Sequence, residues 1–183
     1  MKAKAFITPH ACVLFVAVLV LSSFALAQHE MQKDSASNSP NLVQLVRAAT
    51  QQYLDVNNAT AAGYSPILGC VTGPDHGAMG IHHVNLSLFA SGEIDVSHPQ
   101  ALIYEPLNGQ RRLVGVEYFV DAATYLANHN AASPILDGQL FQYIGSPNRY
   151  NLNPLFELHV WAWRANPQGA YVDWNNKVTC TGE

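Results

Sequence analysis

The chain contains few of the residues and motifs that mark nucleic-acid-binding, redox and phosphate-binding proteins. Lysine and arginine together number 9 among 183 residues, against 13 acidic residues, and they form no basic run. Because binding to nucleic acid needs a cationic face, this composition argues against a nucleic-acid partner. The sequence also lacks a C-x-x-C pair, an H-E-x-x-H motif and a G-x-x-x-x-G-K-S/T loop. The densely spaced metal, redox and phosphate sites that these motifs mark are therefore excluded.

Long apolar runs are also scarce, and the one that approaches membrane length lies at the N-terminus. Lys2 and Lys4 precede an apolar core at 11–21, and Ala25-Leu26-Ala27 supplies small residues at the −3 and −1 positions of a cleavage site. This order is typical of a secretory signal peptide. The apolar core is shorter than the roughly 20 residues that span a bilayer. We therefore expect a signal peptide that ends at Ala27.

The predicted organisation is a signal peptide at 1–27, a flexible lead-in at 28–39 and a single α+β domain at 40–183. The lead-in is polar and lacks periodicity. No later apolar segment is long enough to cross a bilayer, so no membrane contact is expected after cleavage. The protein is thus predicted to be secreted or periplasmic.

Cysteine is scarce as well. Cys12 lies in the predicted signal, which leaves Cys70 and Cys180 in the mature chain. In an oxidising compartment these two residues are expected to form a disulfide, and the alternative is a pair of unpaired buried thiols. The closed loop would span 110 residues, and a loop of that size stabilises a fold by roughly 4–5 kcal/mol in the chain-entropy description.

Helical patterns are confined to two segments. Ser39-Pro40 resembles an N-cap followed by proline at the first helical position, and apolar residues continue at helical spacing towards Gly63. We expect an amphipathic helix of about five turns here. A second, short helix is expected over 122–127, with Asp121 as its cap.

Short apolar runs separated by turn residues make up the rest of the chain. Strands are predicted at 81–84, 101–105, 112–120, 139–144, 155–163 and 171–174. Asn108-Gly109 predicts a tight hairpin turn, and the glycine-rich segment at 69–80 is expected to be a loop. Since strand follows strand through short connections, the sheet should be mainly antiparallel. The predicted fold is α+β, with the N-terminal helix packed on a curved sheet or a partial β-barrel.

Polar residues inside these apolar runs are the strongest chemical signal, because burial of a charge is costly unless it is paired or bound to a metal. They are His82, His83, Glu105, Glu117 and His159. Imidazole and carboxylate together suit zinc, iron or copper, and two histidines with one carboxylate can hold such an ion with positions left open. The set therefore predicts a mononuclear divalent-metal site built across several strands.

The alternation of side chains along a strand sorts these candidates by face. Glu117 is expected on the same face as Leu113 and Phe119. The residues expected on the same face as His159 are Leu155, Glu157, Trp161 and Trp163. Since both faces of these strands are largely apolar, Glu117 and His159 are expected to be buried.

Other interpretations stay open at this stage. The same polar residues could form a buried hydrogen-bond network, with Glu117 paired to an arginine and Glu105 at a solvated strand end. Trp161, Trp163 and Tyr171 could form the stacking platform of a non-catalytic small-molecule or glycan-binding module, or they could pack in the core. A structural envelope protein, whose polar cluster only fixes the fold, is the third function class.

Several segments together resemble a family of small exported bacterial proteins. They are Gly77-Ala78-Met79-Gly80-Ile81-His82, Tyr104-Glu105-Pro106, Leu113-Val114-Gly115-Val116-Glu117-Tyr118-Phe119-Val120 and His159-Val160-Trp161-Ala162-Trp163, with Asn166-Pro167-Gln168-Gly169 and Asp173-Trp174-Asn175. The resemblance covers most of the chain from about residue 42 to Cys180, and it implies a bacterial, secreted or periplasmic setting. It implies no particular activity and carries over no catalytic residue, so it does not decide whether the chain is an enzyme.

The resemblance also bears on the two adjacent histidines. In the family pattern an aromatic residue follows the first histidine, where this chain has His83. Adjacent residues of a strand point to opposite faces, so only one of the two can join a given site, and His82 is favoured. The predicted metal site is therefore His82, Glu117 and His159, with Glu105 as a further ligand or as an acceptor behind the ligands. The pattern names neither a reaction nor an oligomeric state.

Overall fold

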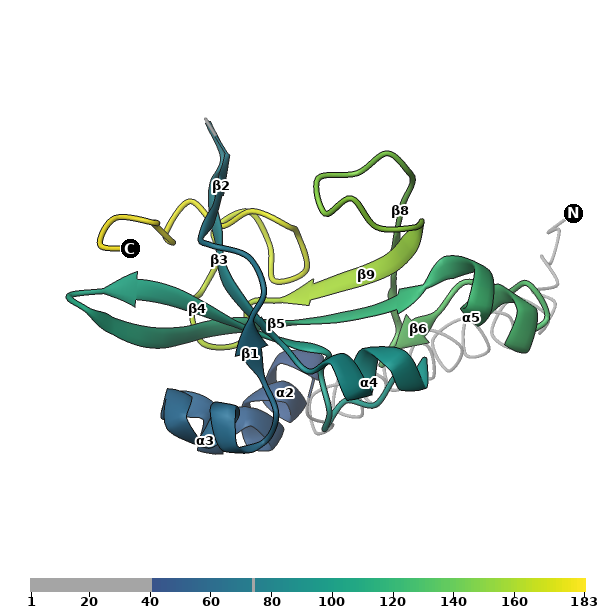
Figure 1. Cartoon of the computed structure of the whole chain (residues 1–183), viewed down its shortest axis with the longest axis horizontal. Helices are drawn as coiled ribbons and strands as arrows, with labels where there is room; N and C mark the ends of the chain where they lie inside the picture. Colours follow the sequence, from purple (N-terminus) through teal and green to yellow (C-terminus); the bar gives the residue numbers. More distant parts are fainter. Residues whose placement is uncertain (1–40, 74) are drawn as a thin grey trace, which may run out of the picture. The chain divides into compact units, whose positions relative to one another are not determined.

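The structure is a computed structural model that describes residues 41–73 and 75–183 (Figure 1). The predictions of a signal peptide at 1–27 and of a lead-in at 28–39 lie outside these residues. Within the described part, no helix is both long and apolar enough to cross a membrane.

Seven strands of the described chain form one sheet in the order β1-β3-β4-β5-β9-β8, with β2 paired to the first half of β3 (Figure 1). The strands are β1 (Ser65–Pro66), β2 (Val71–Gly73), β3 (Gly77–Val84), β4 (Ala101–Leu107), β5 (Gln110–Asp121), β8 (Gln142–Ile144) and β9 (Leu155–Val160). Every pairing is antiparallel, and the sheet is not closed into a barrel. The predicted α+β class with a mainly antiparallel sheet is therefore confirmed, in its open form. A separate hairpin joins β6 (Ile135–Leu136) to β7 (Gln139–Leu140).

The prediction of a single five-turn helix is wrong, because the region forms three short pieces. They are α2 (Leu42–Thr50), the 3₁₀ helix η1 (Gln51–Leu54) and α3 (Val56–Ala61). Asn41, rather than Ser39, caps α2, since its side chain accepts a hydrogen bond from the backbone N–H of Gln44. Asp55 has an extended backbone and caps α3 in a similar way, which separates α3 from η1.

Two of the local predictions are confirmed. Asp121 caps the helix α5 (Ala122–Asn128) by accepting a hydrogen bond from the N–H of Thr124. Asn108 and Gly109 have φ angles of 51° and 75°, the left-handed conformations that a tight turn between β4 and β5 requires. A further short helix, α4 (Leu86–Ser91), follows β3 and is capped by Asn85.

Three of the predicted segments differ from the structure. The glycine-rich segment at 69–80 forms β2 and the start of β3 instead of a loop, and a Cβ at Gly77 would lie only 2.3 Å from the backbone oxygen of Asn175. The predicted strand at 139–144 is split between β7 and β8. The segment 171–174 forms no strand, and only an isolated bridge joins Ala78 to Asn175 next to it.

A β-bulge changes which residues of β5 share a face. In the pairing of β4 with β5, Ile103 lies opposite Gly115 and Tyr104 lies opposite Leu113, so Val114 is left over. Leu113 therefore joins the core on the helical side, and the prediction that it shares a face with Glu117 is wrong.

The two faces of the sheet are covered by different parts of the chain (Figure 1). Helices α2 and α3 pack on one face, where Leu42, Val46 and Ala59 contribute to the main core. The segment after β9 crosses the other face, where Trp161 and Val178 belong to a smaller apolar cluster. The candidate metal ligands lie on this second face, between that cluster and a third one that contains Phe119 and Leu155.

The predicted disulfide between Cys70 and Cys180 is confirmed. The two Cα atoms lie 5.5 Å apart, and the bond closes a loop of 110 residues. It fastens the C-terminal segment, which covers the second face of the sheet, to the chain just before β2. The disulfide therefore holds this C-terminal segment in place on the face of the sheet that carries the candidate site.

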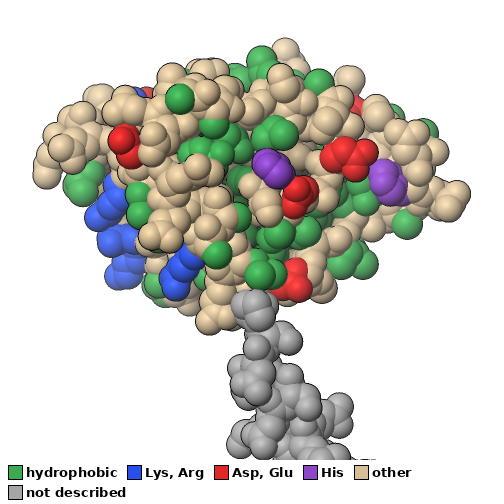
Figure 2. Space-filling model, turned by 90° about the horizontal axis from the view of Figure 1, so that it is seen from below, with side chains coloured by type: hydrophobic (Ala, Val, Ile, Leu, Met, Phe, Trp, Pro, Cys, Tyr) green, Lys and Arg blue, Asp and Glu red, His purple; other side chains and the backbone are tan. Residues whose placement is uncertain are grey.

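Charge is unevenly distributed over the face of the molecule drawn in Figure 2. Lysine and arginine side chains gather toward one edge of this face, whereas most acidic side chains lie elsewhere on it. The basic residues of the described chain are Arg47, Arg111, Arg112, Arg149, Arg164 and Lys177.

Candidate metal centre

Three strands bring His82, Glu117 and His159 together on the second face of the sheet. Glu117 on β5 is the register partner of His159 on β9, and His82 lies two strands away on β3. His82 Nε2 is 3.4 Å from Glu117 Oε2, and the centroids of the two imidazole rings are 5.9 Å apart. One ligand atom from each of the three residues lies within 4.8 Å of the others. Because bonds of about 2.1 Å hold ligands roughly 3–4 Å apart, only a small closure is needed to bind an ion.

Small residues on β4 and β5 allow these side chains to meet. Ala101 on β4 is the register partner of Glu117, so a single methyl group lies directly between Glu117 and β3. His82 is paired with Ile103, which is in turn paired with Gly115. A Cβ at Gly115 would lie 2.9 Å from a backbone oxygen of β9, so these two strands can approach this closely only with glycine there.

Two further carboxylates extend the group on the β9 side. His159 Nδ1 is 3.7 Å from Asp173 Oδ1, and one ligand atom from each of Glu157, His159 and Asp173 lies within 4.8 Å of the others. Strand alternation predicts Glu157 on the face of His159, although the predicted ligand set leaves it out. No local pattern marks Asp173, because it lies in the irregular segment after β9.

The imidazole nitrogens and one carboxyl oxygen of this site are buried and make no hydrogen bond. His82, Glu117, Glu157 and His159 are each at most 5% exposed. Within the described residues, neither ring nitrogen of His82 or His159 makes a hydrogen bond, and Glu157 Oε2 makes none. A buried polar atom without a partner costs about 1–3 kcal/mol. Several such atoms facing one another fit a site that binds an ion.

Burial keeps the two histidines of the site neutral. It lowers the pKa of His82 to about 4, and the positive charge of Arg149 acts in the same direction. Burial also lowers the pKa of His159 well below its ordinary value, and His82 and Arg149 add to this effect. Neutral imidazole is the form that binds a metal, so both rings are in that form at neutral pH.

Burial shifts the pKa of the carboxyl groups in the opposite direction, because it again favours the neutral form. It raises the pKa of Glu117 well above its ordinary value, and the neighbouring Glu157 adds to the rise. Burial and the charge of Asp173 raise the pKa of Glu157 to about 7. Burial also raises the pKa of Asp173. Glu157 is therefore partly protonated near neutral pH, and burial favours the protonated form of Glu117 and Asp173 as well. A bound cation would displace such protons.

Arginine forms no close ion pair with the carboxyl groups of the site, although the positive charge of Arg149 acts to lower the pKa of each of them. The guanidinium of Arg149 lies 4.6 Å from the ring centroid of Trp174, over its face. Among the described residues, no arginine forms an ion pair with Glu117, Glu157 or Asp173. The open interpretation that an arginine pairs with Glu117 is therefore wrong. The polar group beside its carboxyl is the neutral ring of His82, at 3.4 Å.

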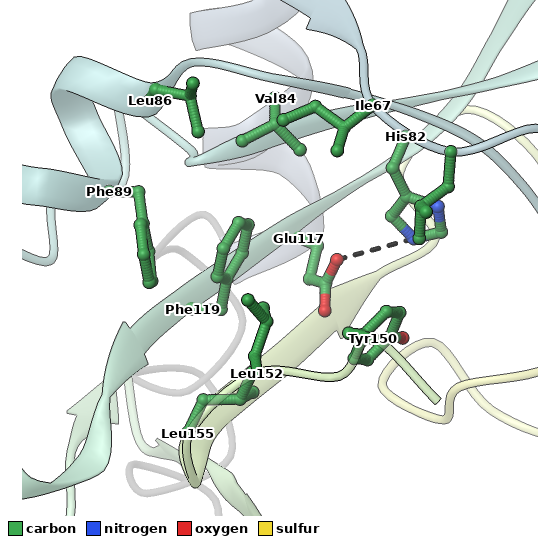
Figure 3. A pocket seen from close by; sticks show the side chains of 11 residues that line it. Ile67, His82, Val84, Leu86, Phe89, Glu117, Phe119, Tyr150, Leu152 and Leu155 are labelled. Carbon is green, nitrogen blue, oxygen red and sulfur yellow. Dashed lines mark ion pairs between the residues drawn. The ribbon is translucent and has the colours of Figure 1, made fainter. Parts of the chain in front are cut away.

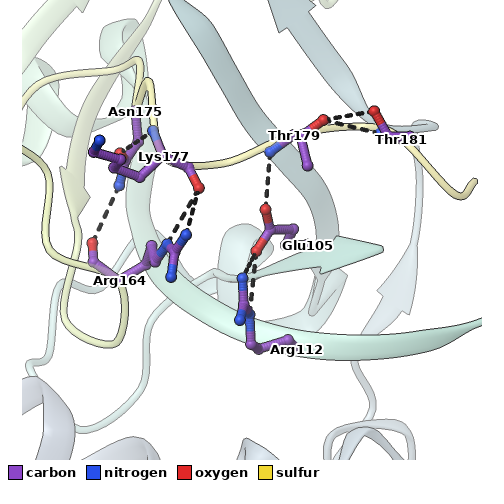
Figure 4. A network of polar contacts seen from close by, with 7 residues as sticks. All are labelled: Glu105, Arg112, Arg164, Asn175, Lys177, Thr179 and Thr181. Atoms are coloured by element: carbon purple, nitrogen blue, oxygen red, sulfur yellow. Dashed lines mark hydrogen bonds and ion pairs between the residues drawn. The ribbon is translucent and has the colours of Figure 1, made fainter. Parts of the chain in front are cut away.

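Glu105 belongs to a different cluster, and its assignment to the metal site is wrong. Its carboxylate is paired with the guanidinium of Arg112 and accepts a hydrogen bond of 2.9 Å from the backbone N–H of Thr179 (Figure 4). The side chain is 1% exposed, so it is not a solvated strand end either. Glu105 therefore fastens the C-terminal segment to the edge of the β4–β5 hairpin.

The remaining sequence candidates also lie away from the site. The ring of His83 packs against Tyr104, whose side chain belongs to the main core, with centroids 4.7 Å apart. Trp161 is 2% exposed and belongs to the smaller cluster on the second face. Trp163 packs against the main core on the other face, as does the partly buried Tyr171. These three aromatic residues therefore form no common exposed platform, because β9 ends at Val160 and the alternation of faces ends with it.

Two hollows reach the group of ligands from different directions. One, the apolar cavity, has a volume of about 190 Å³ and is lined by apolar side chains, with His82, Glu117 and Tyr150 at one end (Figure 3). The other, the polar cleft, has a volume of about 390 Å³ and is lined in part by Arg149, Tyr150, Glu157 and Asp173. Tyr150 lines both hollows. An ion at this site would thus be reachable from a polar side and from an apolar side.

Comparisons with protein-family models, with curated proteins and with solved structures found no match.

Proposed function

We propose that this chain is an exported metal-binding protein, with a mononuclear divalent ion held by His82, Glu117 and His159. The observation that supports this proposal is the meeting of three buried ligand-type side chains from three strands, with imidazole nitrogens that have no other partner. Two imidazoles and one carboxylate suit zinc or ferrous iron, and copper is the further candidate.

Asp173 is proposed to orient His159 from behind. Its Oδ1 is 3.7 Å from Nδ1 of the ring, which leaves Nε2 of His159 as the ligand atom. A carboxylate behind a ligating histidine fixes the tautomer and the orientation of the ring, and it raises the basicity of the ligand. Glu157, which shares the face of His159, adds negative charge beside the ion and is the nearest candidate for a fourth ligand.

The apolar cavity supports a site with an open coordination position. His82 and Glu117 both line this cavity, so an ion bound between them would face it. When bound, an ion of this kind supplies Lewis acidity and lowers the pKa of a coordinated water. His82, Glu117 and His159 would hold the ion, and the apolar side chains of the cavity would exclude bulk water. The carboxyl groups of the site would accept the proton of the coordinated water.

The exported setting rests on separate observations. The pattern at 1–27 is typical of a secretory signal, and the disulfide between Cys70 and Cys180 suits an oxidising compartment. The resemblance to small exported bacterial proteins supports a periplasmic or secreted location in a bacterium, and membership of that family is part of the proposal.

The adjacent histidines of β3 provide a matched test of metal binding. Protein purified without an affinity tag and treated with chelator is titrated with zinc, followed by elemental analysis of the desalted complex. We expect one ion per wild-type chain, at least about a hundredfold weaker binding in His82→Ala, and unchanged binding in His83→Ala. Both substitutions remove a buried imidazole from the same strand, and circular dichroism confirms that each variant is folded.

Two results would overturn the proposal. One is a wild-type protein that retains much less than one ion per chain with zinc, ferrous iron and copper alike. The other is equal loss of binding in both histidine variants while both remain folded, because His83 does not face the site.

A further inference from the structure

The apolar cavity beside the proposed ion has aromatic and aliphatic walls and one polar end. Phe89 on α4 and Phe119 on β5 form its inner wall, with ring centroids 5.0 Å apart, and Val84 and Leu155 complete it (Figure 3). The polar groups at the other end are His82 and Glu117, beside the ring of Tyr150. The cavity therefore combines an aromatic, apolar body with a single polar end.

The volume of the cavity restricts the size of its ligand. A dry cavity of about 150 Å³ lined by Leu, Ile and Phe takes up one benzene molecule. The present cavity, of about 190 Å³, is slightly larger, and it is smaller than the roughly 300–1,000 Å³ pockets that hold drug-sized molecules. It therefore has room for one six-membered ring with a small substituent, and it is too small for a sugar chain or a long acyl chain.

Exposed apolar side chains surround the entrance. Ile67, Leu86 and Leu152 all line the cavity and are 48%, 60% and 42% exposed. Ile67 directly follows β1, Leu86 begins α4, and Leu152 lies in the segment before β9. Apolar side chains gathered at the entrance of a cavity are typical of a ligand-binding site.

We propose that the apolar cavity binds a small monoaromatic molecule with one polar substituent, such as a phenol. The ring packs against Phe89, Phe119 and Leu152, where offset or edge-on aromatic contacts are favourable. The substituent points to the carboxyl group of Glu117, which is the polar group of this end that can pair with a hydroxyl in the ion-free protein, beside the ring of His82. In the metal-loaded protein the substituent faces the ion, and that part of the inference rests on the proposed function.

Phenol and toluene are the probes that test this inference, because they have nearly the same size and only phenol has a hydroxyl group. Each is titrated by NMR into chelator-treated protein and into zinc-loaded protein. We expect phenol to bind in both forms and to bind about tenfold more tightly than toluene, since toluene leaves the polar end unpaired. Intermolecular NOEs from phenol to the rings of Phe89 and Phe119 identify the site without any substitution.

Two variants with the same kind of enlargement provide the control. Val84→Phe places a ring inside the cavity, and we expect it to reduce phenol binding at least about tenfold. Ile135→Phe enlarges an exposed residue of the β6–β7 hairpin, outside the cavity, and we expect unchanged phenol binding. Retained binding in folded Val84→Phe would overturn the inference. If that variant does not fold, the NOEs of the wild type decide.

The outcomes separate this inference from the metal proposal. Phenol binding to a protein that takes up no metal supports the cavity and overturns the proposed function. Zinc uptake without NOEs from phenol to Phe89 and Phe119 supports the proposed function and overturns the inference. Equal affinity for phenol and toluene would also contradict it, because the polar end would take no part. A dimer in light scattering together with no phenol binding would also overturn the inference. The exposed side chains of Ile67, Leu86 and Leu152 would then form an interface between two copies of the chain.

Discussion

The affinity of the site for a divalent ion should fall steeply as the pH is lowered from 8 to 6. A metal ion binds neutral imidazole and ionised carboxylate, so only groups that carry a proton in the ion-free protein compete with it. The pKa of His82 is lowered to about 4, so the ring is already neutral throughout this range and does not contribute. The pKa values of Glu117 and Glu157 are raised, so these groups do contribute.

The size of the effect follows from the raised pKa of Glu157. With a pKa of about 7, this carboxyl group is mostly protonated at pH 6 and mostly ionised at pH 8. Because the ion must displace this proton, the apparent affinity at pH 6 is about tenfold lower than at pH 8. Glu117 changes the affinity in the same direction, because its pKa is raised as well. A decrease of at least about tenfold is therefore expected.

The assay is competition for zinc against a chelator of known proton affinity, together with calorimetry in buffers of different ionisation enthalpy. The competition gives the apparent affinity at each pH, and the calorimetry counts the protons released on binding. In Glu157→Gln, the decrease in apparent zinc affinity from pH 8 to pH 6 should be about tenfold smaller than in the wild type. The matched control is Glu93→Gln, at an exposed position, which should leave the dependence unchanged.

Zinc affinity that is independent of pH between 6 and 8, with no proton release, would refute this reasoning. It would mean that the carboxyl groups are ionised before the ion arrives, or that they do not approach it. A dependence centred near pH 6.5 that persists in Glu157→Gln would contradict it differently, because exposed histidines with an ordinary pKa would then be the ligands.

Three further experiments test the fold around the site. Cys70→Ser with Cys180→Ser should lower the free energy of unfolding by about 2–5 kcal/mol in urea titrations under oxidising conditions, and full stability without the disulfide would contradict its role. Gly115→Ala should destabilise by about 1–3 kcal/mol, because its Cβ would lie 2.9 Å from a backbone oxygen, whereas at Gly145 the nearest atom is 3.8 Å away and Gly145→Ala should be nearly neutral in the same titration. Glu105→Gln should lower stability by about 1–3 kcal/mol and leave zinc affinity unchanged, and a large loss of affinity would return Glu105 to the metal site.

Much of the secondary structure could be predicted from local patterns, because those patterns depend only on residues near one another in the chain. The Asn108-Gly109 turn and the cap at Asp121 are of this kind. The single five-turn helix could not be excluded in this way, since the periodicity continues through Asp55. Its break depends on whether the backbone of Asp55 is extended, and that is settled by packing of the pieces on the sheet.

The candidate site was predictable in part for the same reason. Alternation along β9 places Glu157 and His159 on one face, and this needs no knowledge of the partner strands. The bulge at Val114 could not be predicted, because it arises from the register between β4 and β5. It does not disturb Glu117, which lies on the regular part of β5 beyond the bulge, opposite His159.

Local sequence therefore specifies the antiparallel strands and the polar side chains that each strand offers. Which of these side chains meet depends on strand order and on the path of irregular segments, neither of which leaves a local signal. Strand order brings His82 to Glu117 across the methyl group of Ala101. The segment after β9 brings Asp173 to His159. Glu105 is a buried glutamate like Glu117, yet it lies beside Arg112. The pairing of β4 with β5 places it near the turn of the hairpin, away from His82 and His159.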